Sequence, residues 1–321
     1  MSKSLWREKR PLYLNTNLSA VYAQNSVNKA TRNLDVSYQK LSSGLKINSA
    51  KDDPAGVQTS DRLTVQLNSL NQTNRNAQNA IAYAQTAEGA MEELTTMLER
   101  IRTLAIQSAN GTNSNDNRKA LQDEVDELNE EMCRIARDTT FGGQDLLNGQ
   151  ASIARFQISP DPGSIIKIDL SIGFDTDSLA KLAAKTAGSE TFDLPEGNTF
   201  TTAQSYKFED IFQYKVNGYG IDISTQSAAQ IVLAGIDYMI NAIDTKRSEL
   251  GAIQNRLEST IRNQENVAEN VSDSRAQIRD ADYAEEVSKM TSAQMLQQGS
   301  VTILTQANSK PQIALQMLQD S

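Results

Sequence analysis

The chain has 321 residues, of which 38% are hydrophobic, 5% are aromatic and none is histidine, and its formal net charge is −9. A protein this acidic argues against binding to nucleic acids, which require clustered Lys and Arg, and against adhesion to anionic lipid. With no His and with Cys133 as the single cysteine, the chain lacks the commonest general base, the commonest metal ligand and any intramolecular disulfide. The sequence therefore predicts no enzyme, no catalytic residue, no cofactor and no metal site.

The N-terminal stretch resembles neither a membrane anchor nor a secretion signal. Met1–Arg10 is basic, but Pro11 and the polar Asn15–Asn17 follow where a signal peptide has an apolar stretch. Nowhere does the chain approach the about 18–20 consecutive apolar residues of a membrane span. We expect no membrane span, and an exported protein of this kind would need another route.

The first helical pattern follows this stretch. Val27, Leu34 and Leu41 recur every seven residues, which predicts one apolar helix face. The pattern stops at Ser42–Gly44, and a polar link follows. We therefore expect a helix that ends near Gly44.

The second helical pattern is the longest. Asp53 is a good N-cap and Pro54 suits the first helical position, where no N–H is needed. Seven consecutive heptad positions follow, which indicates a coiled-coil-like seam; they are Leu63, Leu70, Ala77, Ala84, Met91, Leu98 and Ala105. The turn cluster Asn110–Asn115 ends it. A third helix follows, whose apolar residues are spaced four and three apart, at Leu121, Val125, Leu128, Met132 and Ile135. So short a break predicts an antiparallel helical hairpin.

The period changes after Phe141, where most strand and turn signals lie. Phe156–Ile158 and Ile166–Leu170 are predicted strands that form one hairpin, and Tyr214–Tyr219 is predicted as another with Asn-Gly at its turn. A short helix near Leu179–Ala187 fits between them.

Helical patterns return after Ile223. Apolar residues repeat every seven residues with one polar member, at Ile236, Ile243, Leu250, Leu257, Gln264, Val271 and Ile278. Asp280–Asp282 interrupts this pattern. A last helix follows, and Pro311 is expected to limit it.

Together these patterns predict a mainly α fold. Its long antiparallel helices are coiled-coil-like, and most strands and turns lie between the helical ends of the chain. A lone helix of about 25 residues is marginal in water, and an ordinary bundle core would be the simpler reading of a single apolar stripe. Because each terminal helix stands behind its own polar break, we infer that both ends fold on assembly.

The residues expected to pack the terminal helices, within a subunit or between subunits, are the large apolar ones of the two terminal patterns. They are Val27, Leu34, Leu41, Val287, Met290, Leu296, Val301 and Leu304.

Several stretches resemble one family, the bacterial flagellins. Leu41–Gly56 reads LSSGLKINSAKDDPAG, and AEGAM at Ala87–Met91 and QSAN at Gln107–Asn110 follow it. LGAIQNR at Leu250–Arg256 and DYAEEV at Asp282–Val287 resemble the C-terminal counterpart. The resemblance covers roughly residues 12–172 and 222–315.

The resemblance implies a mainly α fold, with a long antiparallel helical, coiled-coil rod, paired terminal helices, a β-hairpin in the rod and a small α+β outer insert. It also implies a domain order. Residues 1–11 form an extra leader. Residues 12–52 and 280–321 form the two halves of an inner tube domain, residues 53–172 and 223–279 form the two parts of a rod domain, and residues 173–222 form a short variable outer insert.

The resemblance also implies a function. Subunits of this family polymerise into the helical filament that a rotary motor turns as a propeller for swimming. It implies export by the flagellar type III apparatus, an export chaperone on Val287–Leu318, and work with filament cap and hook-associated proteins outside the cell. The hook–filament junction protein, which shares the terminal helices, is the alternative function.

A further implication is contact with host Toll-like receptor 5. The positions that match the receptor-binding pattern are Arg100, Leu104, Gln107 and Glu124. Thr103 stands where receptor-active members usually have Glu. Core packing for Leu104, and a solvated face for Arg100 and Glu124, are the alternative explanations.

Overall fold

The computed structural model describes residues 16–151, 153–187, 191–194, 204–207, 212–215 and 218–319. The expected leader, residues 1–11, lies outside them, as do several stretches of the expected outer insert. Contacts divide the chain into two compact units. We call Met1–Leu67 with Glu269–Ser321 the terminal unit, and Asn68–Ala268 the central unit.

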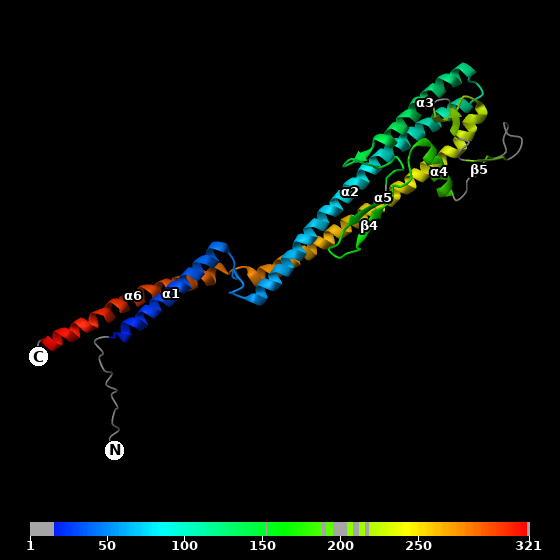
Figure 1. Ribbon diagram of the computed structural model, residues 1–321. Coiled ribbons are helices and arrows are strands. Elements are labelled where there is room, and N and C mark those ends of the chain that lie inside the picture. Colours follow the sequence, from blue (N-terminus) through cyan, green and yellow to red (C-terminus); the bar gives the residue numbers. More distant parts are fainter. Residues whose placement is uncertain are drawn as a thin grey trace. The chain divides into compact units, whose positions relative to one another are not determined.

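Helices dominate the described residues, as the sequence predicted (Figure 1). They are α1 Leu18–Ser43, α2 Pro54–Ala109, α3 Asn115–Asp138, α4 Thr176–Ala187, α5 Gln226–Arg279 and α6 Tyr283–Gln319. The boundaries between the two units fall inside α2 and α5.

The helix ends follow the predicted signals. The Asn17 side chain accepts a hydrogen bond from the Ala20 N–H at the start of α1, and Gly44 ends α1 with φ of 71°. Glycine tolerates this left-handed conformation, which other residues rarely adopt. The Asp53 carboxylate accepts from the Ala55 N–H at the start of α2, as its position before Pro54 predicted.

The strands form four antiparallel pairs among the described residues. The pairs are β1 Thr140–Phe141 with β2 Gln144–Asp145, β3 Ala154–Gln157 with β4 Ile165–Ile168, β5 Thr191–Leu194 with β6 Gln204–Lys207, and β7 Phe212–Lys215 with β8 Gly218–Ile221. Both predicted hairpins are present. In the second, Gly218 pairs with Lys215 inside the ladder, whereas the sequence placed it in the turn.

The central unit contains the main apolar core. The α2 and α5 helices run antiparallel, because Thr73 bonds Gln264, Glu88 bonds Gln254 and Arg102 bonds Asp237. Seven of the fourteen predicted heptad residues of the two helices are buried in this core, including Met91, Leu98, Ile236 and Ile243. Ala77 and Leu257 are buried in a second, smaller cluster. The Tyr83 ring packs edge-on against the rings of Phe141 and Phe156, with distances between ring centroids of 5.8 and 5.5 Å. These contacts hold two hairpins against α2.

The buried face of α3 is more polar than the predicted one. Its buried residues are Arg118, Gln122, Val125, Asn129, Met132 and Ala136, whereas the predicted Leu121, Leu128 and Ile135 are only partly buried at the edge of the core. Arg118 and Gln122 bond backbone groups, and Asn129 accepts a hydrogen bond from the Thr176 hydroxyl at 2.7 Å. Gln122, for example, donates to the Ile221 carbonyl and accepts from the Ile223 N–H at 2.8 and 2.5 Å.

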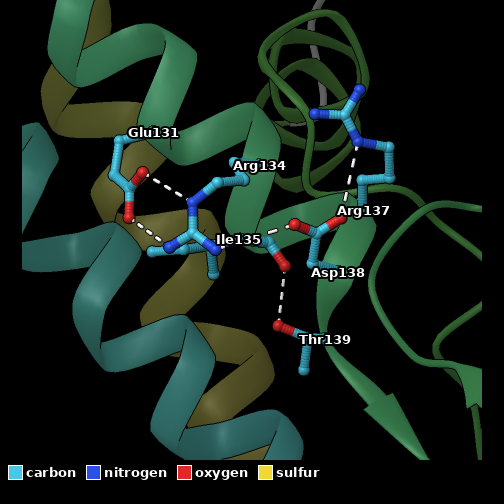
Figure 2. Close-up of polar contacts among 6 residues, drawn as sticks. All are labelled: Glu131, Arg134, Ile135, Arg137, Asp138 and Thr139. Atoms are coloured by element: carbon cyan, nitrogen blue, oxygen red, sulfur yellow. Dashed lines mark hydrogen bonds and ion pairs between the residues drawn. The ribbon is translucent and has the colours of Figure 1, made fainter.

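The C-terminal end of α3 is held by charge and by a hydroxyl cap (Figure 2). The Arg134 guanidinium bonds both Glu131 oxygens, at 2.7 and 2.5 Å, which lowers the pKa of Glu131. The Thr139 hydroxyl and N–H both donate to the Ile135 carbonyl. Cations near a helix C-terminus and a bonded last turn both stabilise the end of the helix.

One predicted boundary is wrong. Pro311 does not limit the last helix, because it lies inside α6, which continues to Gln319. A proline inside a helix removes the N–H that would bond the carbonyl four residues earlier, here that of Ala307. The hydrogen bond that replaces it is described below.

Candidate assembly interface formed by the terminal helices

The α1 and α6 helices lie antiparallel in the terminal unit, as the sequence predicted for the two ends (Figure 1). Their least exposed residues alternate three and four apart, which is a heptad pattern on both helices. We call this contact the seam. On α1 it comprises Ala20, Ala23, Val27, Ala30, Leu34, Ser37 and Leu41, and on α6 Glu286, Met290, Ala293, Gln297, Ser300, Leu304, Ala307 and Pro311.

The seam is built mainly from small and polar residues. The Ser37 hydroxyl donates to the buried Glu286 carboxylate at 2.8 Å, and the Gln297 amide donates to the Thr31 hydroxyl at 2.9 Å. The Tyr283 hydroxyl donates to the Leu41 carbonyl at 3.1 Å. Because these bonds are spread along both helices, they set the register between α1 and α6.

The polar breaks at Gly44 and Asp280 lie side by side and are bonded to each other. The Lys46 N–H donates to the Arg279 carbonyl at 2.7 Å, and the Ala281 N–H donates to the Gly44 carbonyl at 2.9 Å. Leu45 and Asp280 form an antiparallel bridge. What the sequence shows as two separate interruptions is therefore one hydrogen-bonded joint.

The seam also completes α6 at its proline. Pro311 cannot donate to the Ala307 carbonyl, and the Asn17 amide nitrogen donates to that oxygen instead, at 2.7 Å. The Asn17 side-chain oxygen meanwhile caps α1. One side chain therefore satisfies both a helix start and the carbonyl that a proline leaves without a helical donor.

We expect the effects of substitutions at Asn17 and Pro311 to be coupled. Asn17→Ala should lower the thermal stability of the α1–α6 pair. In a Pro311→Ala background the loss should be smaller by about 1 kcal/mol, because the new N–H satisfies the Ala307 carbonyl. Thermal melting of assembled protein, followed by circular dichroism for the two single variants and the double variant, measures this coupling. Strictly additive shifts would contradict it.

The predicted packing residues divide between two environments. Leu34 is buried in the seam, and Val27, Leu41, Met290 and Leu304 are half-buried there. The other three lie outside the seam, since Val287, Leu296 and Val301 are 39%, 63% and 45% exposed.

Sequence reasoning missed several seam residues because it followed large apolar side chains. The missed residues are Ala20, Ala23, Ala30, Ser37, Glu286, Gln297 and Ser300. One signal was available, because Glu286, Ala293, Ser300 and Ala307 recur every seven residues. Small residues at that spacing let two helices approach closely.

An ion pair borders the seam on α6. The Lys289 ammonium lies 2.7 Å from a Glu285 oxygen and 3.6 Å from a Glu286 oxygen. The hydrogen bond to Lys289 lowers the pKa of Glu285, and the same bond raises the pKa of Lys289. Both exposed charges are thus retained across the neutral range.

The four residues considered for receptor contact lie in the central unit. Arg100 is exposed and Glu124 is partly exposed, and the two bond each other at 2.5 Å, linking α2 to α3. Gln107 is exposed, whereas Leu104 is 1% exposed and lies in the core. The structure therefore brings three of these side chains to the surface and buries the fourth.

Two kinds of feature are absent from the described residues. No group of three or more His, Cys, Asp or Glu residues there could hold a metal ion. No helix in the described part of the chain combines the length and apolarity needed to cross a membrane.

Comparisons with known proteins agree on one family. Residues 14–152 match the bacterial flagellin N-terminal helical region, and residues 233–318 match the C-terminal helical region. Flagellin B of Vibrio cholerae and flagellin A of Vibrio anguillarum are each 37% identical, over 95% of this chain and 99% of theirs. A solved structure of FliC from Burkholderia pseudomallei is 20% identical and covers 55% of this chain and 99% of its own, with a TM-score of 0.41. That score is too low for a detailed comparison of folds.

Proposed function

This chain belongs to the bacterial flagellin family, and we propose that it builds its filament by packing the exposed apolar sides of its α1–α6 pair against those of neighbouring copies. Its function is that of a structural subunit of the flagellar filament, which serves swimming motility. The hook–filament junction alternative is not favoured, since the chain matches flagellins over nearly its whole length.

The observation that carries this proposal is the reversed polarity of the terminal pair. Small and polar residues occupy the seam between α1 and α6, whereas large apolar side chains point outward. The exposed ones include Tyr22, Val36, Met295, Leu296 and Ile303, which are 46–65% exposed. A soluble pair of helices normally shows the opposite arrangement. Exposed apolar groups gathered on one element indicate a surface that another molecule covers.

The domain order remains part of the proposal. We assign residues 12–52 and 280–321 to an inner tube domain, 53–172 and 223–279 to a rod domain, and 173–222 to the outer insert. The joint between Gly44 and Asp280 supports a limit near these residues. The compact units divide instead after Leu67 and before Glu269, inside α2 and α5.

Export and partners complete the proposal. We expect export by the flagellar type III apparatus, with a chaperone covering Val287–Leu318 before secretion, and insertion at the tip with cap and hook-associated proteins. The support is the row of exposed apolar residues on α6, which would aggregate if left uncovered in the cell. The mature protein would then lie outside the cell, in the filament.

Recognition by Toll-like receptor 5 stays a prediction for Arg100, Gln107 and Glu124. Their support is their exposure along neighbouring turns of α2 and α3. Leu104 would act only by packing beneath them, because it is buried.

The test of filament function is seeded polymerisation. Purified monomer is added to short filament fragments, and growth is followed by electron microscopy, with a variant lacking residues 1–10 in parallel. We expect both proteins to elongate the seeds. If neither elongates, the filament function is contradicted.

We expect both ends of the free monomer to be sensitive to protease. The small, polar seam buries little apolar area, so the α1–α6 pair is only marginally stable without neighbours. Limited proteolysis should remove the chain up to about Gly44 and from about Asp280, and leave a resistant core. Mass spectrometry of the products measures this, and assembled filaments should be protected. Equal protection of monomer and filament would contradict folding on assembly.

A further inference from the structure

A groove of about 420 Å³ lies beside the seam, on one side of the α1–α6 pair. Val36 and Lys40 of α1 and Lys289 and Leu296 of α6 are among the residues that line it. Val36 and Leu296 are 46% and 63% exposed. The groove therefore presents two apolar side chains to solvent, with a cation from each helix next to them.

The apolar surface extends along both helices from this groove. Tyr22 lies fourteen residues before Val36, and Ile303 lies seven residues after Leu296, so each shares a helix face with its partner. Both are exposed. We call Tyr22, Val36, Leu296 and Ile303 the groove face.

The other side of the seam carries a different apolar surface. On α1, Lys40 lies one residue before the seam residue Leu41, whereas Tyr38 lies one residue after the seam residue Ser37. Positions just before and just after the seam residues lie on opposite sides of a heptad helix. Tyr38 therefore lies away from the groove, and it is 51% exposed.

The same reasoning places two valines of α6. Leu296 precedes the seam residue Gln297, whereas Val287 and Val301 follow the seam residues Glu286 and Ser300. In an antiparallel pair the following positions of both helices share one side. The Thr31–Gln297 hydrogen bond agrees, because Thr31 lies seven residues before Tyr38. We call Tyr38, Val287 and Val301 the tyrosine face.

We propose that in the filament the groove face of each copy binds the tyrosine face of the next copy. The inference rests on the filament function and assigns the two sides of the contact. One apolar face that binds itself would produce a dimer and stop, whereas two different faces that bind each other allow growth to continue. The terminal pair has two such faces, on opposite sides.

Charge supports pairing of unlike faces. Lys40 and Lys289 line the groove together with Glu286, which lies 3.6 Å from Lys289, so Lys40 is the cation that two groove faces in contact would bring together. Asp35 is exposed and lies four residues after Thr31, on the side of the tyrosine face. Contact between unlike faces thus brings opposite charges closer, and contact between like groove faces does not.

Cysteine cross-linking within filaments tests the pairing. In a Cys133→Ser background, Leu296→Cys marks the groove face and Val301→Cys marks the tyrosine face. One variant is labelled with ¹⁵N, the two are co-assembled in equal amounts on seeds, and a bismaleimide is added. Mass spectrometry then identifies the linked peptides. Ile303→Cys with Val287→Cys is a second pair on the same faces.

We expect links between a residue 296 and a residue 301 of different copies, at least tenfold more abundant than links between two residues 296. The reverse ratio, or filaments without links in either pair of variants, would overturn the pairing of unlike faces. Links confined to one chain would overturn it too. Failure of the Cys133→Ser protein to elongate seeds would instead count against the filament function, so the two failures are distinguishable.

Discussion

Replacing Arg118 with methionine should destabilise the central unit by about 3 kcal/mol. Arg118 is 8% exposed, and its guanidinium donates to the carbonyls of Ser108, Asn110 and Asn113 at 2.9–3.2 Å. These three carbonyls lie in the last turn of α2 and just after it, at the negative end of the helix dipole. Methionine keeps the apolar stem and leaves three acceptors without their donor.

The measurement is urea unfolding of the full chain followed by far-ultraviolet circular dichroism. Lys119→Met is the matched control, because Lys119 is the next residue of α3 and is exposed. We expect the Lys119→Met midpoint to equal that of the parent protein. Hydrogen exchange should also accelerate around residues 107–123 only in Arg118→Met. Equal midpoints for the two variants would show that Arg118 does not hold the α2–α3 turn.

The example of Arg118 shows where sequence reasoning succeeds and fails on this fold. Long apolar heptads of α2 and α5 were predicted residue by residue, because large side chains at regular spacing have one stable solution, which is burial. Polar residues at the same spacing can either face solvent or be buried with a specific hydrogen-bond partner. The pattern identifies Gln264 as the polar member of its heptad. It does not predict that Gln264 bonds Thr73 and the Ile158 carbonyl.

In the terminal pair it is large apolar residues, not polar ones, whose burial the sequence pattern does not predict. Sequence reasoning found both helices and their breaks, because these depend on local signals such as Gly44 and Asp280, whereas the pairing of the two helices was implied by the family resemblance. It could not separate the seam from the outer faces, since it treated every large apolar residue as a packing residue. Val287, Leu296 and Val301 are exposed, and only a three-dimensional arrangement shows that alanines fill the seam in their place.

Pro311 was misjudged for a related reason. A proline usually ends a helix because the carbonyl four residues earlier loses its donor. Here that donor comes from Asn17, 290 residues away along the chain. No local pattern contains such a partner.

Replacing Ala293 with leucine should block filament growth, although leucine is apolar and a good helix former. Ala293 is 6% exposed in the seam and borders the groove beside it, so a leucine side chain would have to displace residues of α1 or extend into that groove. Overpacking of this kind costs about 1–3 kcal/mol per site. Since 1.4 kcal/mol is a factor of ten in an equilibrium constant, the critical concentration for elongation should rise about tenfold or more.

Ala284→Leu is the matched control, because it makes the same change at an exposed position of the same helix. Its critical concentration in seeded elongation should stay within about twofold of the parent, in line with the small effects of most surface substitutions. If Ala293→Leu elongates as the control does, the seam is not closely packed in the filament. If both variants are blocked, the surface around Ala284 is itself a subunit contact, and close packing of the seam would have to be tested by Ala30→Leu instead. The contrast between two identical substitutions thus separates a tight internal seam from a general intolerance of added apolar volume on α6.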